Sequence, residues 1–480
     1  MKLPKYKRDA FTFISNLSDY TANEAYPDTY LRDGYLLSEH YTTNKTKRLA
    51  ADVKRRRNLL ISDNGNYSRM KALAKQFQAE GLALLQQAKK EKEETGTVQL
   101  TTVAATKQLI ETIAFACSLT LQQTNYEEII QIQLAIKPHY LIGLEDLTIP
   151  VLMLCHLMHP VFSPVASEIH PFQQQTSTLF KAQLEGHYGA KKTLDQVAKF
   201  MVLHAYDYDS AFQAGQASLA TPKEGVAISY GGPMHSRRWI EQLAIGGQTI
   251  NLPEKLPEAY LIAQTITLGA VNGHPTTIPF HILGVGTPIL IALIGYQLRH
   301  SKAVSIDSTA PFKDAFIGKL YGESKAFLKM DMYKLVAYCL IHDQPFSSKS
   351  PFYQAFALKY EHNWKGLQAH LQITPSDSIK DIAQRLKEDL TLLEQYLPFF
   401  TTITGRLDKV FLQDLRIARA GYNFWIIQRI CKKVRIYRNN PSRFKTWIEQ
   451  VVDQYTTVAS RKWATTVALT YELAEKYRAL

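Results

Sequence analysis

The chain has 480 residues, of which 46% are apolar and 21% charged, and Lys plus Arg exceed Asp plus Glu by 13. This composition is typical of a globular protein with two or three domains or one large barrel, and it excludes a disordered, fibrous or collagen-like chain. The four cysteines are widely spaced, which excludes a disulfide scaffold and indicates a reducing cytosol. The start of the chain has no apolar run long enough for a signal peptide, and no stretch of the sequence is long and apolar enough for a membrane span, so we expect a cytoplasmic protein with no membrane partner.

The first third of the chain predicts few strands and much helix. Residues 1–50 are rich in Tyr, Thr and Asn, and their weak periodicity predicts loops with short helices. The apolar run 58–63 ends at polar, turn-forming residues and predicts a buried strand. Residues 67–95 consist largely of strong helix formers at helical spacing and predict a helix, and residues 98–134 predict one or two more.

The middle of the chain alternates between strand-like and helix-like runs. Strands are expected over 140–144, 225–230, 242–246, 278–285 and 303–306. Helices are expected between them over 192–218, 254–270 and 287–300. This alternation is typical of parallel α/β proteins, and the charged residues and glycines at the strand ends favour a (β/α)8 barrel of the TIM type, in which such ends meet at one mouth. Periodicity alone leaves a doubly wound sheet open.

The last part of the chain predicts helices only. The strands are expected to stop after about residue 320, and residues 377–480 contain helical, aromatic and basic segments. We therefore expect an N-terminal extension over 1–54, a barrel with insertions over 55–375, and an appended, basic, helical C-terminal domain over 376–480.

Basic residues are clustered. Nine Lys or Arg residues and no acid lie between Arg416 and Lys445, interleaved with aromatic residues, and residues 45–57 contain seven basic residues and one acid. Because cations neutralise phosphates and aromatic rings stack on bases, these clusters favour a nucleic-acid partner over a merely basic surface. The cations expected to meet phosphates are Lys432, Lys433, Arg435 and Arg438, together with Arg237 and Arg238, for which a solvated helix start is the alternative.

Carboxylates follow several of the expected strands. Asp63 in ISDNGN and Asp307 in VSIDST each come directly after an apolar run and before small polar residues, and Glu145–Asp146 occupies a similar place in LIGLEDLTIP. In a barrel, such side chains point into the mouth. The alternative for any one of them is that it caps the following helix.

Glycines form a second pattern at the expected strand ends. Gly231–Gly232, Gly246–Gly247 and Gly284–Gly286 follow three of the runs. Glycine allows a flat ligand to approach the backbone closely, although tight turns between strands and helices also require it.

The chain resembles one known family in these motifs. The segment FHILGVGTP, followed by a helix and AVSIDSTAP, is similar to the last two strands of the tRNA-guanine transglycosylase superfamily, and the likeness runs in order over about residues 55–365. The resemblance implies a TIM-type barrel, with Asp307 as the nucleophile that attacks the sugar and Asp63 as the acid that recognises the base and handles the proton. It also implies that Asp146, Gly231, Gly232, Gly246 and Gly247 contact the base.

The resemblance also implies a reaction and its partners. Such a glycosyltransferase (pentosyltransferase) exchanges guanine in a polynucleotide for a free 7-deazaguanine base and requires no redox or nucleotide cofactor. The family's tRNA enzymes carry a zinc site, but only Cys339, His342 and His362 stand in that neighbourhood here, with Asp343 or His370 as the fourth candidate, so a metal-free segment is expected. This loss and the additional C-terminal helices are more similar to the branch that acts on DNA.

Two alternatives stay open at this point. One is a tRNA-guanine transglycosylase with a degenerate zinc site, and the other is a barrel subunit that binds nucleic acid without catalysis. The presence of both Asp63 and Asp307 favours an enzyme. The sequence leaves open which deazaguanine enters and whether a helper protein takes part.

Overall fold

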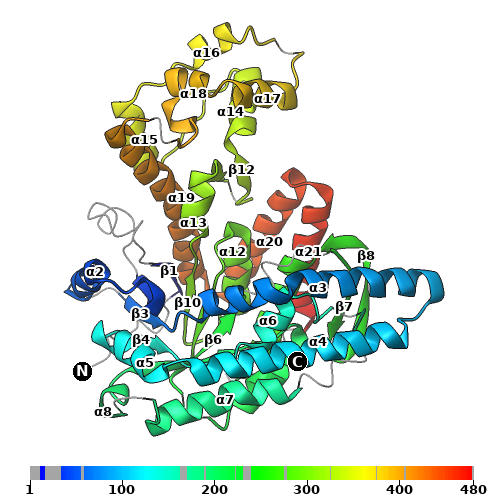
Figure 1. Ribbon diagram of the computed structural model, residues 1–480. Coiled ribbons are helices and arrows are strands. Elements are labelled where there is room, and N and C mark those ends of the chain that lie inside the picture. Colours follow the sequence, from blue (N-terminus) through cyan, green and yellow to red (C-terminus); the bar gives the residue numbers. More distant parts are fainter. Residues whose placement is uncertain are drawn as a thin grey trace.

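A computed structural model describes residues 11–16, 34–55, 59–159, 161–162, 170–188, 191–221, 223–230, 239–274, 278–324, 326–374, 376–404 and 407–477. The centre of the molecule is a closed barrel of eight parallel strands (Figure 1). This confirms the barrel predicted from the sequence and eliminates the doubly wound sheet.

The barrel strands are short, and most of their residues are buried. They are β1 (Phe11–Asn16), β2 (Gly34–Ser38), β3 (Leu59–Asp63), β4 (Tyr140–Ile142), β5 (Ala198–Leu203), β6 (Gly225–Ser229), β9 (Pro279–Leu283) and β10 (Ala303–Asp307). Around the barrel the order is β1-β10-β9-β6-β5-β4-β3-β2, and β1 closes it by pairing with β10 on one side and β2 on the other.

Helices follow most of these strands along the chain. The helices of this part are α2 (Asn44–Arg55), α3 (Asn66–Thr95), α4 (Leu100–Gln123), α5 (Tyr126–Ala135), α6 (Thr148–Leu154), α7 (His170–Glu185), α8 (Lys191–Leu194), α9 (Tyr208–Ser218), α11 (Glu258–Gly273), α12 (Pro288–Gln297) and α13 (Ala310–Phe316). The long helices α3 and α4 pack against each other and cross the front of the molecule in Figure 1. After β6 the chain forms an antiparallel hairpin of β7 (Trp239–Ile245) and β8 (Gln248–Pro257), which is separate from the barrel sheet.

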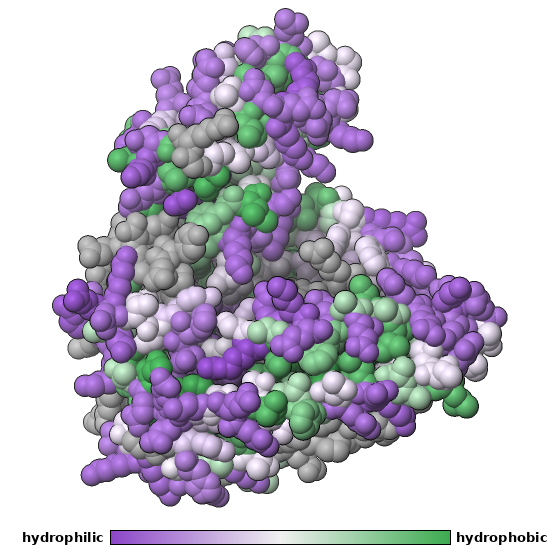
Figure 2. Space-filling model, viewed as in Figure 1, coloured by the Kyte–Doolittle hydropathy of each residue, from purple (hydrophilic) through white to green (hydrophobic). Residues whose placement is uncertain are grey.

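The remainder of the chain is mainly helical. After the short hairpin β11 (Lys319–Tyr321) and β12 (Lys329–Asp331) come α14 (Met332–Ile341), α15 (Pro351–Lys359), α16 (Trp364–His370), α17 (Ile379–Glu388), α18 (Leu390–Tyr396), α19 (Lys409–Tyr437), α20 (Pro441–Val458) and α21 (Arg461–Tyr477). Helices α14 to α18 form an upper lobe in Figure 1, and its surface in Figure 2 is largely hydrophilic. The helix α19 extends from this lobe and packs against α12, α13 and β1. The C-terminal helices therefore share one hydrophobic core with the barrel wall.

Alternation along each strand separates the inside of the barrel from its outside. Ile14, Ile61, Ile142, Phe200 and Ala227 belong to one buried cluster that fills the barrel interior, whereas their neighbours on the same strands pack outward. Because successive side chains of a strand point to opposite faces, a strand-end residue two positions after an interior one also points inward. This places Asp63, two residues after Ile61, on the interior side of its strand.

Three expectations about the secondary structure are wrong. Residues 1–50 were expected to form loops and short helices, yet β1 and β2 belong to the barrel. The expected helix 192–218 contains β5, because a short, continuous apolar run does not distinguish a buried strand from a buried helix segment. The run 242–246 belongs to the β7–β8 hairpin and is not a barrel strand. The expected long helix over 67–95 is confirmed as α3, and the helical character of residues 377–480 is confirmed in the described part of that range.

Candidate active site

The carboxyl ends of the barrel strands gather acids and histidines at one mouth. Asp63 is the last residue of β3 and Asp307 the last residue of β10. Ser38 ends β2 opposite Asp63 in the register, and His204 directly follows β5. The sequence-predicted pair Asp63 and Asp307 is therefore brought to the same end of one barrel, where reactive groups of such barrels lie.

The surroundings of Asp63 shift its acid–base equilibrium toward the protonated form. Burial is the largest cause and the nearby carboxylates of Glu145 and Asp307 add to it, and together they raise the pKa of the Asp63 carboxyl to about 6. A hydrogen bond from the backbone N–H of Gly65 to Oδ2 (3.2 Å) acts against this rise but does not cancel it. Because like charges disfavour ionisation, the other two acids favour the protonated form of Asp63. A carboxyl with a pKa near neutrality is suited to give and take a proton.

Asp307 lies against a buried histidine. Nε2 of His281 is 3.4 Å from Oδ1 of Asp307, and the other ring nitrogen, Nδ1, is 2.8 Å from the hydroxyl of Ser305. The backbone N–H of Gly284 also points at Oδ1, at 3.4 Å. His281 is fully buried and Asp307 is only 5% exposed, so these contacts hold the carboxylate in one orientation at the end of β10.

A second acid–histidine pair comes from the loops after β4 and β5. Oε2 of Glu145 is 2.6 Å from Nε2 of His204, and both side chains are buried. The amide of Asn64 donates to the carbonyl of Gly143 (2.8 Å) and lies 3.4 Å from Oε1 of Glu145, which connects the ends of β3 and β4.

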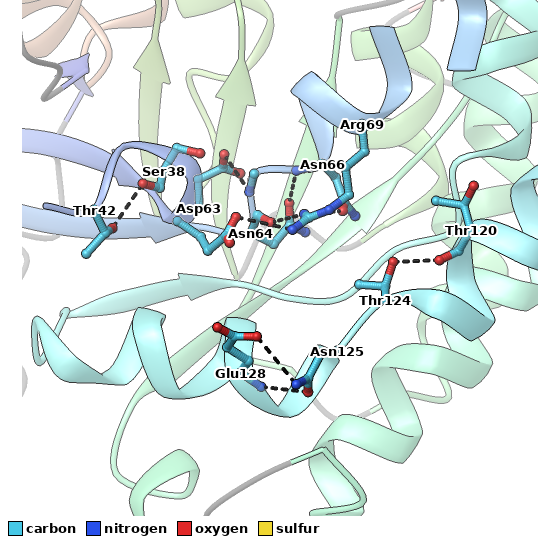
Figure 3. A network of polar contacts seen from close by, with 12 residues as sticks. Ser38, Thr42, Asp63, Asn64, Asn66, Arg69, Thr120, Thr124, Asn125 and Glu128 are labelled. Carbon is cyan, nitrogen blue, oxygen red and sulfur yellow. Dashed lines mark hydrogen bonds and ion pairs between the residues drawn. The ribbon is translucent and has the colours of Figure 1, made fainter. Parts of the chain in front are cut away.

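The start of α3 is held beside Asp63 by a polar network (Figure 3). The guanidinium of Arg69 donates to the backbone carbonyl of Asn64 (2.7 Å) and to the side chain of Asn66 (3.1 Å), and it pairs with Glu39 at 3.3 Å. The network joins the segment after β2 to the start of α3. The network therefore fixes the backbone that directly follows Asp63.

Asp146 has a different environment from the one expected for a base-reading acid. One oxygen, Oδ1, accepts the backbone N–H of Thr148 (2.9 Å), the first residue of α6, and this bond stabilises the turn into the helix, whose N-cap residue is Leu147. The other oxygen, Oδ2, is buried and has no hydrogen-bond partner in the part of the chain that the structure describes. Burial raises the pKa of this carboxyl. Of the two neighbouring acids Glu145 and Asp146, it is Glu145 that acts electrostatically on Asp63 and raises its pKa.

Of the glycines predicted to contact the base, the structure describes Gly246 and Gly247. Gly246 and Gly247 form the turn of the β7–β8 hairpin, with positive φ angles of 59° and 73°, and no heavy atom lies within 4 Å of a Cβ built on either residue. The hairpin is not part of the barrel sheet, so this strand end does not line the barrel mouth as the sequence suggested. Gly231 and Gly232, like Arg237 and Arg238, lie outside the described residues.

The C-terminal basic cluster divides into two kinds of cation. Lys432 and Lys433 are exposed on α19. Arg435 is half-buried, with one N–H directed at the carbonyl of Phe11 (3.4 Å). Arg438 is 6% exposed and donates to the carbonyls of Arg299 and Ser301. The expectation that Arg438 meets phosphate is therefore wrong, because its guanidinium is used inside the protein to join α19 to the segment before β10.

We expect Arg438→Gln to lower the free energy of unfolding by about 2–4 kcal/mol, because it leaves buried carbonyls without donors and opens a cavity. Urea unfolding followed by circular dichroism measures this change. The matched control is Lys432→Gln on the same helix, which should stay within about 0.5 kcal/mol of the parent protein since the side chain is exposed. Equal stability of the two variants would contradict the structural role of Arg438.

The residues that the resemblance would assign to zinc do not fit a metal. Nε2 of His362 accepts the backbone N–H of Phe399 at 3.4 Å, and its ring stacks on Tyr353. Burial lowers the pKa of His362 to about 4. Cys339 is buried and the ring of His342 lies against Tyr338. Across the described ranges, no group of three or more His, Cys, Asp or Glu side chains is arranged to hold a metal ion.

Two residues of the mouth were missed in the sequence. His281 lies within the motif FHILGVGTP and was not predicted to be a site residue. Alternation along β9 directs it to the same face as Leu283, which packs on the interior cluster. His204 follows the apolar run of β5, which the helical assignment concealed. A polar residue at an inward position of an otherwise apolar strand was the signal that would have found His281.

Comparison with known proteins does not assign the chain to a family, so the resemblance to the transglycosylases stays an expectation. No protein-family model matches the chain, and no curated protein matches it significantly. Among the described helices, none is both long enough and apolar enough to cross a lipid bilayer.

Proposed function

We propose that this protein exchanges guanine in DNA for a 7-deazaguanine base through a covalent intermediate on Asp307. The observation that carries the proposal is the coupled carboxylate pair of the barrel mouth: Asp307 acts electrostatically on Asp63, whose pKa is raised to about 6. A two-step displacement at a glycosidic carbon requires two acids at one site, one to form the bond to the sugar and one to transfer the proton. The motifs around them, which resemble those of the tRNA-guanine transglycosylases, supply the substrate class.

The proposed chemistry has two balanced half-reactions. In the first, a carboxylate oxygen of Asp307 attacks C1′ of the target nucleotide, the bond from C1′ to the guanine nitrogen breaks, and protonated Asp63 gives its proton to the departing base. In the second, the ring nitrogen of the incoming base attacks C1′, the bond to Asp307 breaks, and ionised Asp63 takes the proton of that nitrogen. Asp63 thereby returns to its starting state.

Residues of the loops would read the base. Oδ2 of Asp146 is buried with no hydrogen-bond partner within the described residues, so it has capacity to accept an N–H of a heterocycle. Because the target base must reach the mouth of a barrel, it must leave the base stack. His281 is assigned a positioning role, since it is fully buried and lies against Asp307.

The C-terminal helices are proposed as an appended domain that binds the polynucleotide. A cavity of about 500 Å³ between α19, α20, Glu323 and Phe327 contains Arg429, Lys433 and Arg443, of which Arg429 pairs with Glu323 at 3.5 Å. Lys433 and Arg443 each lie near the ring of Tyr437, at 5.3 and 5.1 Å from its centre. Cations grouped around aromatic rings favour a phosphate-bearing ligand. With DNA or tRNA as substrate, the proposed reaction belongs to the cytoplasm.

Neutralising Lys432, Lys433 and Arg443 to Gln should weaken DNA binding and reduce the slope of log K against log salt by about two to three units, because about one counterion is released for each phosphate contact. Fluorescence anisotropy over a range of salt concentrations measures this slope. The control variant neutralises three exposed lysines of the upper lobe, Lys334, Lys365 and Lys380, so both variants lose the same net charge. If the salt slope changes equally in both variants, the surface of α19 and α20 is not part of the polynucleotide interface.

The decisive experiment is the incorporation of labelled guanine. The protein is incubated with labelled guanine and either duplex DNA or tRNA, and the label in each purified polymer is counted. Exchange requires no knowledge of which deazaguanine is the natural base. Label in DNA supports the proposal, and label only in tRNA supports the alternative of a tRNA enzyme. If the protein binds both polymers and labels neither, the result supports a non-catalytic barrel or a requirement for a helper protein.

A further inference from the structure

A second basic surface lies on the face of the barrel that bears the acids. A groove with a volume of about 1310 Å³ runs between α3 and the β7–β8 hairpin, and side chains from residues 154–159 and 161 form its end. We call it the α3–hairpin groove. Helix α3 follows β3, residues 154–159 and 161 belong to the connection after β4, and the hairpin belongs to the connection after β6. All three walls are therefore segments that leave the carboxyl ends of barrel strands, which is the side of Asp63 and Asp307.

Lysines line the α3 wall of this groove at helical spacing. The groove residues of α3 include Lys71, Lys75, Lys89 and Lys92, and the only acid that α3 contributes is Glu93 at the far end. The helix begins at Asn66, within the network beside Asp63, and it carries these lysines outward over about 32 Å at 1.5 Å per residue. A row of this length extends over several nucleotides of a bound strand.

The opposite wall adds an aromatic ring and little negative charge. Trp239 is 45% exposed, and Nζ of Lys462 lies 4.4 Å from the centre of its ring. The acid of this wall, Glu241, pairs with Lys255 at 3.0 Å, which neutralises it. The groove as a whole therefore carries excess positive charge next to an exposed ring, the combination that binds phosphates and stacks bases.

The floor of the groove is set by close packing. Gly81 of α3 is buried where the helix meets the end of α6, and a Cβ at this position would lie 2.0 Å from the carbonyl oxygen of Cys155. Only glycine permits this approach of the two backbones. The lysine row and the segment that follows α6 are thus held in a fixed relation, so these two walls of the groove are preformed.

We infer that the α3–hairpin groove binds the backbone of the polynucleotide strand that leads to the reacting nucleotide. This inference rests on the proposed function for the identity of the ligand, and it adds a surface outside the C-terminal helices. The recognised chemistry is a run of phosphates with bases able to stack on Trp239. DNA and RNA share this chemistry, whereas an acidic protein segment offers carboxylates but no bases.

The test is equilibrium binding of the full chain to fluorescent oligonucleotides, which requires no base exchange and so succeeds or fails independently of catalysis. The groove variant combines Lys71→Gln, Lys75→Gln and Lys92→Gln, all at exposed positions, and the control variant is the upper-lobe one already defined. Single-stranded DNA, duplex DNA and RNA are the probes, and polyglutamate is the competitor. The unfolding midpoint of each variant verifies its fold, and the single variant Lys75→Gln repeats the comparison with one charge removed.

We expect the groove variant to bind single-stranded DNA about tenfold or more weakly at 100 mM salt, with the salt slope reduced by about two units, and the control variant to change little. Trp239→Leu should lower affinity several-fold with an unchanged slope, because stacking releases no counterions. The relative affinities of DNA and RNA identify the natural polymer. Equal losses in the groove and control variants, or competition by polyglutamate as strong as that by DNA of equal charge, would overturn the inference.

Discussion

Asp307→Ala is expected to abolish base exchange while the protein still binds polynucleotide. The carboxylate of Asp307 is the group that would form the bond to C1′, so its removal eliminates the covalent route and leaves only the rate that binding provides. Losses of a covalent nucleophile commonly amount to 10⁴-fold or more, and we expect a decrease of about this size in labelled-guanine incorporation. Binding should persist because the basic surfaces lie on other segments.

The matched control for this variant is Glu224→Gln. Glu224 immediately precedes β6, at the opposite end of the barrel, where it accepts the backbone N–H of Lys199 at 2.8 Å. This variant should retain exchange. Acid quenching during turnover, followed by peptide mapping, should locate the sugar adduct on the peptide that contains Asp307. An adduct on another acid, or substantial exchange by the folded Ala variant, would reject the assignment.

Asp63→Asn should lower exchange by roughly 10²-fold or more, because the amide cannot transfer the proton that guanine and the incoming base require. The pH dependence distinguishes this role from a structural one. With a pKa of about 6, Asp63 loses its proton as the pH rises through that value, so kcat/KM of the parent protein should fall above pH 6. The variant should lack this descending limb. An unchanged pH profile in a folded variant would show that Asp63 is not the proton carrier.

The same substitution should stabilise the fold at neutral pH. The pKa of Asp63 is raised from 3.8 to about 6, so the folded state holds a proton more tightly than the unfolded state does. The free energy of unfolding of the parent protein therefore falls as the pH rises from about 4 to 6 and stays low above that range. Asn carries no charge, so the variant should be more stable by about 3 kcal/mol at pH 7.5 and similar to the parent at pH 4. Urea unfolding at the two pH values measures the difference.

The sequence by itself determined the class of fold and the two acids. Strand-like runs that alternate with helical ones predict a parallel α/β protein, and an apolar run that ends in Asp is a local pattern that needs no knowledge of the partner strand. Asp63 and Asp307 were found in this way, and both end barrel strands. The long helix α3 was equally evident, because its helix formers continue over about eight turns.

Only the tertiary structure decided which strands close the barrel and which polar groups meet. The strands β1 and β10 are neighbours in the barrel although nearly all of the barrel's sequence separates them. Periodicity indicates which residues of a strand are buried, but it does not identify the strand's neighbour. The same limit concealed the contacts of His281 with Asp307 and of His204 with Glu145. Arg438 lies in a basic segment and was therefore expected on the surface, yet its guanidinium is buried and donates to backbone carbonyls. The charge of a side chain can be read from the sequence. Its burial and its hydrogen-bond partners depend on segments far away in the chain. Burial and partners decide whether the charged group can bind a ligand or stabilises the fold instead.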